Sequence, residues 1–204
     1  SLCFVVITAF VYLSAPQLSH ATEKSLAADL QERLLSQYEG ADRLGAYDEE
    51  VNVWPVMKGD TVLGYAFETD DQVSIPAYSG KPVNVLVSFD TEGTFRNSWV
   101  LEHHEPILLV GIPAEKLWNF AAQYIGKEIT DKIRVGFSSD PNALTVDAVT
   151  GATVTVIVVN DTIMKSAHKA AEKLGLIEAK VGGELAPVVI RPLASLSRGR
   201  SELS

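Results

Sequence analysis

The stretch DAVTGATVTVIVVNDTIMKSAHKAAEKLG, residues 147–175, decides the fold of this chain. From Thr153 to about Leu174 it has the apolar content and spacing of a long helix, and Gly175 stands where a helix usually ends. The three residues before Thr153 are small, which is typical of a loop that meets a helix. The first N–H groups of a helix have no partner within it and carry partial positive charge. The junction is therefore a candidate seat for a phosphate group.

The junction differs from the common nucleotide-binding loops. It has no P-loop lysine and lacks the glycine spacing of a Rossmann fingerprint, so nucleotide hydrolysis and NAD binding are poorly supported. A plainer interpretation also fits, in which the side chain of Thr150 or Thr153 caps the helix. The residues alone leave phosphate binding and capping open.

Upstream of the helix the pattern changes to strands. Residues 51–57 and 61–69 flank a turn at Lys58-Gly59-Asp60, which predicts a β-hairpin. Residues 83–89 and 95–104 flank a second turn at 90–93, which predicts another.

Helical spacing occurs in two further segments. Residues 25–38 carry an apolar residue at every fourth position, with Thr22 or Ser25 as the expected N-cap. Residues 113–126 begin with Pro113, which suits the first turn of a helix. The predicted fold class is α+β: a twisted, largely antiparallel sheet packed with helices and closed by the long helix after Thr153.

Composition narrows the classes of function. The chain has 204 residues, 47% of them hydrophobic, which suits one well-cored domain. Its 17 Lys and Arg against 26 Asp and Glu give a net charge of -9, so we expect no nucleic-acid contact by this domain. Cys3 is the one cysteine, and it lies in an apolar N-terminal run outside the predicted folded part. Disulfide scaffolds, thiolate zinc sites and iron–sulfur clusters are therefore excluded within this chain.

The two ends of the chain differ from its middle. Residues 2–15 form an apolar run too short to cross a bilayer comfortably, and small and polar residues follow it up to Ala21. We interpret residues 1–21 as a secretory signal peptide truncated at its start, residues 22–178 as the folded domain, and residues 179–204 as a linker or the start of a following region. The domain is thus expected to be exported, with the periplasm as its location.

A family resemblance adds to this interpretation. The motif DAVTGAT at 147–153 matches D-x-x-(S/T)-G-A-T, at which flavin transferases of the ApbE type attach FMN. Around it, GADRLGAY (40–47), GYAFETDDQVSIPAYSGKPVNVLV (64–87) and LEHHEPILLVGIPAEKL (101–117) resemble the periplasmic FMN-binding domain of the NosR/NirI family. The resemblance covers roughly residues 38–176.

The resemblance implies a cofactor, a site and partners. FMN would be joined through a phosphodiester to the hydroxyl of Thr153, and the recognition motif would include Asp147, Thr150, Gly151 and Ala152. The domain would be an electron-transfer module rather than a stand-alone enzyme. Its partners would be an ApbE-like flavin transferase and the nitrous-oxide reductase system of denitrification, whose expression, maturation or activity it would support. Membrane attachment would come from regions beyond this chain, in an inner-membrane protein.

Further candidate cofactor contacts lie at the helix start and in one loop. Thr155 shares the first helical turn with Thr153. The loop from Tyr78 to Lys81 offers an aromatic ring, the exposed backbone of Gly80 and the Lys81 cation, which would favour an anionic reduced flavin; an ordinary strand-entry turn is the alternative. A flavin ring could also pack against one of the tryptophans, judged by residue type alone: Trp54, Trp99 or Trp118. The alternative is that these side chains are ordinary core residues.

The segment His103-His104-Glu105 is the remaining polar cluster. In the family it resembles a block that packs near the cofactor, which makes His104 and Glu105 candidate flavin contacts, although the chain lacks the Thr-Pro-Gly of related versions. If the segment is a strand, the two histidines point to opposite faces and cannot both bind one ion unaided. The alternative function is a non-redox sensory or metal-binding assembly domain that uses His103 and His104.

Overall fold

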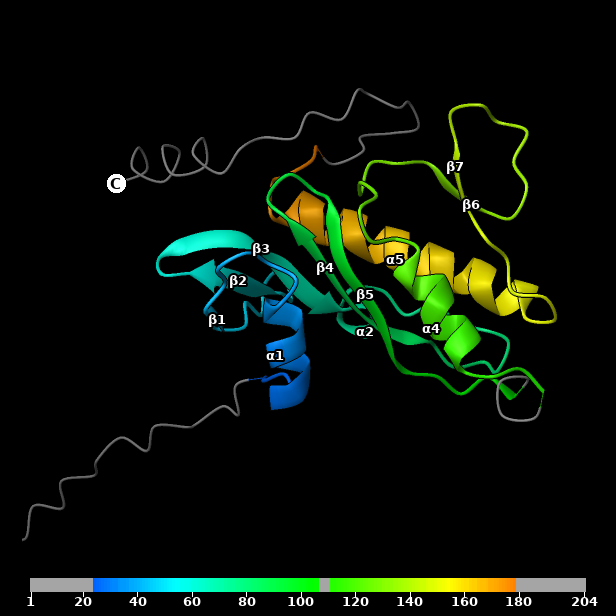
Figure 1. Cartoon of the computed structure of the whole chain (residues 1–204), viewed down its shortest axis with the longest axis horizontal. Helices are drawn as coiled ribbons and strands as arrows, with labels where there is room; N and C mark the ends of the chain where they lie inside the picture. Colours follow the sequence, from blue (N-terminus) through cyan, green and yellow to red (C-terminus); the bar gives the residue numbers. More distant parts are fainter. Residues whose placement is uncertain (1–23, 107–110, 179–204) are drawn as a thin grey trace, which may run out of the picture.

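The computed structural model describes residues 24–106 and 111–178. Its main feature is an antiparallel sheet in the order β1-β2-β3-β4-β5, with helices on both faces (Figure 1). The strands are β1 (Arg43–Leu44), β2 (Trp54–Lys58), β3 (Thr61–Glu68), β4 (Asn84–Asp90) and β5 (Phe95–Glu102). The helices are α1 (Ala28–Leu35), α2 (Thr69–Gln72), α4 (Glu115–Ala122) and α5 (Thr153–Lys173). The predicted α+β class, with its largely antiparallel sheet, is confirmed.

Both predicted hairpins form, each on the turn that the sequence indicates. Gly59 has a φ of 55° between β2 and β3, a backbone conformation that glycine adopts without steric cost. Between β4 and β5 the Asp90 carboxylate accepts hydrogen bonds from the backbone N–H groups of Glu92 and Thr94. Arg96 forms an ion pair with the same carboxylate at 2.7 Å. Because these contacts lie within the turns, they place β2 next to β3 and β4 next to β5.

The alternation of side chains along β4 separates two cores. Val85, Val87 and Phe89 belong to the larger core, which also contains apolar residues of α4 and α5. Leu86 belongs to the smaller core on the opposite face, with Leu34 of α1. Because every one of these β4 side chains is buried, the strand is covered on both faces.

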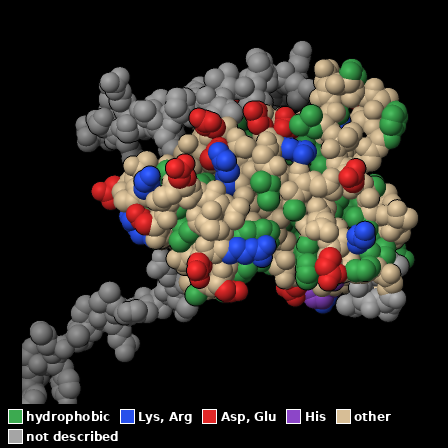
Figure 2. Space-filling view, in the orientation of Figure 1, with side chains coloured by type: hydrophobic (Ala, Val, Ile, Leu, Met, Phe, Trp, Pro, Cys, Tyr) green, Lys and Arg blue, Asp and Glu red, His purple; other side chains and the backbone are tan. Residues whose placement is uncertain are grey.

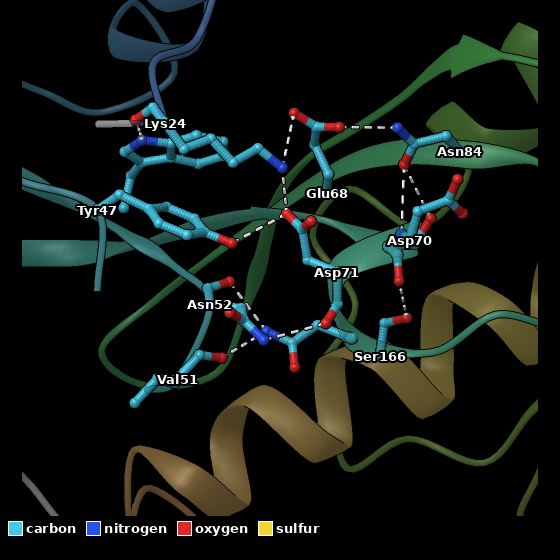
Figure 3. Close-up of polar contacts among 12 residues, drawn as sticks. Lys24, Tyr47, Val51, Asn52, Glu68, Asp70, Asp71, Asn84 and Ser166 are labelled. Atoms are coloured by element: carbon cyan, nitrogen blue, oxygen red, sulfur yellow. Dashed lines mark hydrogen bonds and ion pairs between the residues drawn. The ribbon is translucent and has the colours of Figure 1, made fainter. Parts of the chain in front are cut away.

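A polar cluster fastens the beginning of the described chain to the sheet (Figure 3). The Lys24 ammonium forms ion pairs with Glu68 and Asp71, and Tyr47 donates a hydrogen bond to Asp71 at 3.0 Å. The indole N–H of Trp54 donates to the backbone carbonyl of Lys24 at 3.2 Å. Trp54 therefore has a structural role in this cluster.

Two expectations are wrong at the level of individual elements, and one pair of strands was not predicted. Helix α1 begins after Ala27, so Ser25 is not its N-cap, and Thr22 lies outside the described residues. Strand β5 ends at Glu102, so His103 and His104 follow the strand and do not alternate across the sheet. The parallel pair of β6 (Ile133–Val135) and β7 (Leu144–Val146) was not predicted, because runs of three residues give no readable period.

The remaining expectations concern the two ends of the chain, membrane-spanning helices and the surface charge. The predicted signal peptide at 1–21 and the predicted linker at 179–204 lie outside the described residues. Within residues 24–106 and 111–178, no helix has the length and apolar content needed to cross a membrane. On the face shown in Figure 2, basic and acidic side chains are interspersed.

One buried hydrogen bond joins the segment after α4 to the middle of α5 and gives a stability prediction. The Tyr124 hydroxyl donates to Asn160 Oδ1 at 2.7 Å, and burial raises the pKa of Tyr124, so the donor proton stays in place. Tyr124→Phe leaves a buried amide oxygen without this donor and is expected to lower the free energy of unfolding by about 1–3 kcal/mol. Urea unfolding measures the loss. The exposed Tyr78→Phe serves as the control, and equal stability of the two variants would contradict the prediction.

Candidate functional site

An open cleft lies at the beginning of α5. It has a volume of about 390 Å³ and is lined by residues from two segments that are far apart in sequence. Tyr78 contributes one wall. The start of α5 contributes the other, through Gly151, Ala152, Thr153, Val154 and Thr155. The structure thus brings the predicted loop and the predicted motif together.

The start of α5 has no side-chain cap. Ala152 occupies the N-cap position, and no side chain of the described residues accepts a hydrogen bond there, so the interpretation of Thr150 or Thr153 as a helix cap is wrong. The first backbone bond within the helix runs from Val156 N to Ala152 O at 3.0 Å. The preceding N–H groups of the first turn have no intrahelical acceptor and remain available to an anion.

Thr153 is exposed, and its hydroxyl has no hydrogen-bond partner among the described residues. The surface beside it is apolar. Val154 is 60% exposed and Ile157 47%, and Tyr78 across the cleft is 74% exposed. An accessible hydroxyl, free backbone donors and exposed apolar side chains therefore meet at one place. Such a surface suits the face of a conjugated ring.

The buried side chain of Glu105 connects the two walls of the cleft through hydrogen bonds. It is fully buried, and its Oε2 accepts a hydrogen bond from Thr155 Oγ1 at 2.5 Å. Its Oε1 accepts one from the backbone N–H of Ser79 at 2.9 Å. Burial alone would raise the pKa of Glu105, but the hydrogen bonds from Thr155 and Ser79 and the nearby His103 outweigh it and lower that pKa. The carboxylate is therefore ionised at neutral pH.

The loop that carries Tyr78 is a tight turn. Gly80 N donates to Ala77 O, Ala77 N donates to Lys81 O, both at 2.9 Å, and Gly80 has a φ of 80°. Gly80 and Lys81 are exposed in this loop, but neither lines the cleft in the described structure. The loop is thus both a strand-entry turn and a cleft wall, with Tyr78 as the residue that reaches the cleft.

Asp147 and Thr150 lie on the approach to the helix and outside the cleft. The Asp147 side chain is exposed, while its backbone is held by Gln123, whose Oε1 accepts from Asp147 N at 2.7 Å. Thr150 borders a neighbouring hollow of about 300 Å³ beside Ile112 and Lys116. Sequence reasoning missed Gln123, because nothing in its local sequence connects it to a loop that far along the chain.

The histidines lie at the edge of this region. His104 is exposed and its Nε2 lies 3.4 Å from Glu102 Oε1. The His103 Nδ1 atom is buried and has no hydrogen-bond partner among residues 24–106 and 111–178. Within the described ranges, no group of three or more His, Cys, Asp or Glu side chains is arranged to hold a metal ion.

The three tryptophans do not line the cleft. Trp54 is buried against Tyr47 with ring centroids 4.7 Å apart, and Trp99 lies under Arg33, whose guanidinium carbon is 4.0 Å from the ring centroid. Trp118 is half exposed on α4. Of the aromatic candidates, only Tyr78 is placed at the cleft in the described structure.

This combination of fold and cleft defines a cofactor-binding α+β domain, and comparison with known proteins gives its class. The model of the FMN-binding domain family matches residues 78–168, which include Tyr78 and the whole start of α5. The described residues that line the cleft therefore all lie within the part of the chain that matches an FMN-binding domain.

The relatives specify the family further. The chain is 46% identical over 171 residues to the regulatory protein NosR of Pseudomonas aeruginosa, which covers 84% of this chain and 24% of that protein. It is 46% identical over 168 residues to NosR of Stutzerimonas stutzeri, covering 82% and 23%. With the protein NirI of Paracoccus denitrificans it shares 29% over 139 residues, covering 68% and 19%. The chain belongs to the NosR/NirI family through its FMN-binding domain, and it spans about a quarter or less of the length of these relatives.

Proposed function

We propose that this domain is an exported electron-transfer module that carries FMN covalently on Thr153. The observation that carries the proposal is the exposed, unpartnered Thr153 hydroxyl at the uncapped start of α5. A phosphodiester keeps one negative charge, and a helix N-terminus stabilises such a charge by about 0.3–1 kcal/mol. When bound, FMN supplies one-electron and two-electron transfer.

The residues of the cleft fit this group. The free N–H groups of the first turn would hold the phosphate, and Tyr78 and Val154 would supply apolar surface for the ring. Thr155 borders the same space. We assign Gly80, Lys81 and His104 to the surroundings of the ring, where the Lys81 cation would favour an anionic reduced cofactor.

An ApbE-like flavin transferase would load the cofactor. Such an enzyme must reach both the acceptor hydroxyl and the residues that it recognises. Asp147, Thr150 and Gly151 are exposed, as is Thr153, while Ala152 is buried beneath them. The motif is thus presented on one accessible loop, which suits recognition by a second protein.

The wider setting follows from the relatives. We propose that residues 1–21 direct export to the periplasm, that residues 22–178 form the domain, and that residues 179–204 lead toward membrane regions beyond this chain. The relatives named NosR are regulatory proteins. By analogy, the module would pass electrons to the nitrous-oxide reductase system and support its expression, maturation or activity in denitrification.

The test is the intact mass and visible absorption of the domain after co-expression with a flavin transferase. We expect a gain equal to FMN minus one water on the peptide containing Thr153, and a yellow colour that survives denaturation. The same protein expressed without the transferase is the control. An unmodified, colourless domain from the co-expression would overturn the proposal.

The turn before Thr153 gives a second prediction. Gly151 has a φ of 85°, and a Cβ added there would lie 3.0 Å from Ile112 Cδ1. Gly151→Ala is expected to lower the free energy of unfolding by about 1–2 kcal/mol and to slow FMN loading, because the turn must distort. Gly126→Ala is the matched control, since Gly126 has a φ of 82° and open space around it. Calorimetry and loading assays should show similar destabilisation in both but slow loading only in Gly151→Ala; normal loading there would contradict the prediction.

A further inference from the structure

The buried carboxylate of Glu105 has a role that the proposed attachment of FMN does not explain. Taking a charged carboxylate out of water is costly unless hydrogen bonds compensate for the lost solvation. Glu105 is fully buried, and each of its two oxygens accepts one hydrogen bond, from Thr155 and from Ser79. These two donors belong to the two segments that form the cleft walls. The carboxylate thus joins the walls at a place that no other described side chain bridges in the same way.

The direction of the bond from Thr155 constrains what the cleft can bind. A threonine hydroxyl has one proton to donate and lone pairs that accept. Because an ionised carboxylate only accepts, the Thr155 proton must point to Glu105. Toward the cleft, which Thr155 lines, its oxygen can then only accept. The neighbouring N–H groups of the helix start can only donate.

The cleft therefore presents two kinds of hydrogen-bonding group: backbone N–H groups, which only donate, and the Thr155 hydroxyl oxygen, which only accepts. A phosphate oxygen, which accepts, suits the backbone N–H groups. A group beside Thr155 must instead donate, as a ribityl hydroxyl or a ring N–H of a flavin does.

We propose that Glu105 is a positioning residue for the flavin, which holds the Tyr78 loop against the start of α5 and makes Thr155 an acceptor toward the cofactor. The inference rests on the proposed function, since it takes FMN as the ligand. The buried negative charge of Glu105 also disfavours an anionic reduced flavin nearby, and so lowers the midpoint potential of the flavin.

Two substitutions separate the shape of Glu105 from its charge. In Glu105→Gln, the amide oxygen can accept from Ser79 N while the amide NH₂ donates to Thr155 Oγ1, which frees the Thr155 proton to point into the cleft. The walls stay joined, but Thr155 changes from acceptor to donor and the charge is lost. Glu105→Leu removes both hydrogen bonds. Thr155→Val is the matched control, because it removes the hydroxyl and leaves the bond to Ser79 intact.

The first measurement uses the unloaded domain. Amide hydrogen exchange at Ser79 should match the wild type in Glu105→Gln and Thr155→Val, and should be about tenfold faster or more in Glu105→Leu. The second measurement uses the domain loaded by a flavin transferase. Glu105→Gln should load FMN, with a midpoint potential above that of the wild type and a shifted flavin absorption spectrum. Glu105→Leu should load at least about tenfold more slowly, because the walls are no longer held together.

The outcomes distinguish this inference from the proposed function. If the wild type takes up no FMN, both are overturned. If the wild type loads normally and Glu105→Gln has the wild-type potential and spectrum, the inference fails while the proposed function stands. A Glu105→Leu domain that does not fold leaves the decision to Glu105→Gln, whose side chain has nearly the same shape.

Discussion

Replacing Thr153 with alanine is expected to abolish covalent FMN attachment completely while leaving the fold intact. The hydroxyl oxygen of Thr153 is the atom that would form the phosphodiester, and alanine has no substitute for it. The exposed side chain makes no hydrogen bond within the described structure, so its loss should change the free energy of unfolding by no more than about 0.5 kcal/mol. Intact mass and in-gel flavin fluorescence after co-expression with a flavin transferase measure the result.

Two controls make the Thr153→Ala result specific. Thr153→Ser keeps a hydroxyl at the same position and should still accept FMN. Thr145→Ala removes another exposed threonine, on the neighbouring strand β7, and should load as the wild type does. If Thr153→Ala retained flavin after denaturation, the attachment point would lie elsewhere, and the assignment of Thr153 would be wrong.

Gly64→Ala is expected to cause the largest loss of stability, about 3 kcal/mol or more. A Cβ at this position in β3 would lie 2.4 Å from the backbone oxygen of Phe89 and 2.7 Å from a ring carbon of Tyr38. The first contact is with the backbone of the paired strand β4, so it cannot be relieved by turning a side chain. Overpacking of a filled core typically costs 1–3 kcal/mol, and a backbone clash belongs at or above the upper end of that range. Chemical denaturation measures the change.

Gly59→Ala is the matched control for Gly64→Ala. Gly59 lies in the turn between β2 and β3, the hairpin that also contains Gly64. It has a φ of 55°, and no atom lies within 4 Å of an added Cβ. Its substitution should cost only the strain of a positive φ, about 1–2 kcal/mol. Equal losses for the two glycines would mean that β3 and β4 can move apart at Gly64 and that the predicted clash is relieved.

Much of the fold could be predicted because its signals are local. The alternation in β4, the turns at 58–60 and 90–93, and the long apolar segment from Thr153 all depend on residues close together in sequence. Each of these elements forms as predicted. The exceptions are short or terminal: the pair β6 and β7 has only three residues in each strand, and β5 stops at Glu102 before the histidines.

The candidate site also has features that the local sequence predicted and features that it did not. The motif at 147–153 predicted the start of a helix, and α5 begins at Thr153 without a side-chain cap at Ala152 in the described structure. The sequence could not show whether a threonine side chain would take those N–H groups, because that depends on the rotamer and the turn before the helix. By residue type, it also offered Trp54 and Trp99 beside Tyr78 as aromatic candidates for the flavin site. Burial separates them, since Tyr78 lies at the cleft while the two tryptophans pack elsewhere.

By itself, the sequence determined the class of fold, its two hairpins and the family, because hydrophobic periodicity, turn residues and the flavin motif each depend on a short segment of the chain. Tertiary structure decided how the site is held. Gln123 supports Asp147, Glu105 joins Ser79 to Thr155, and Gly64 must lack a side chain because Tyr38 and β4 fill its space. Each of these contacts links residues that are distant along the chain. Their partners are chosen by packing, and no local pattern records that choice.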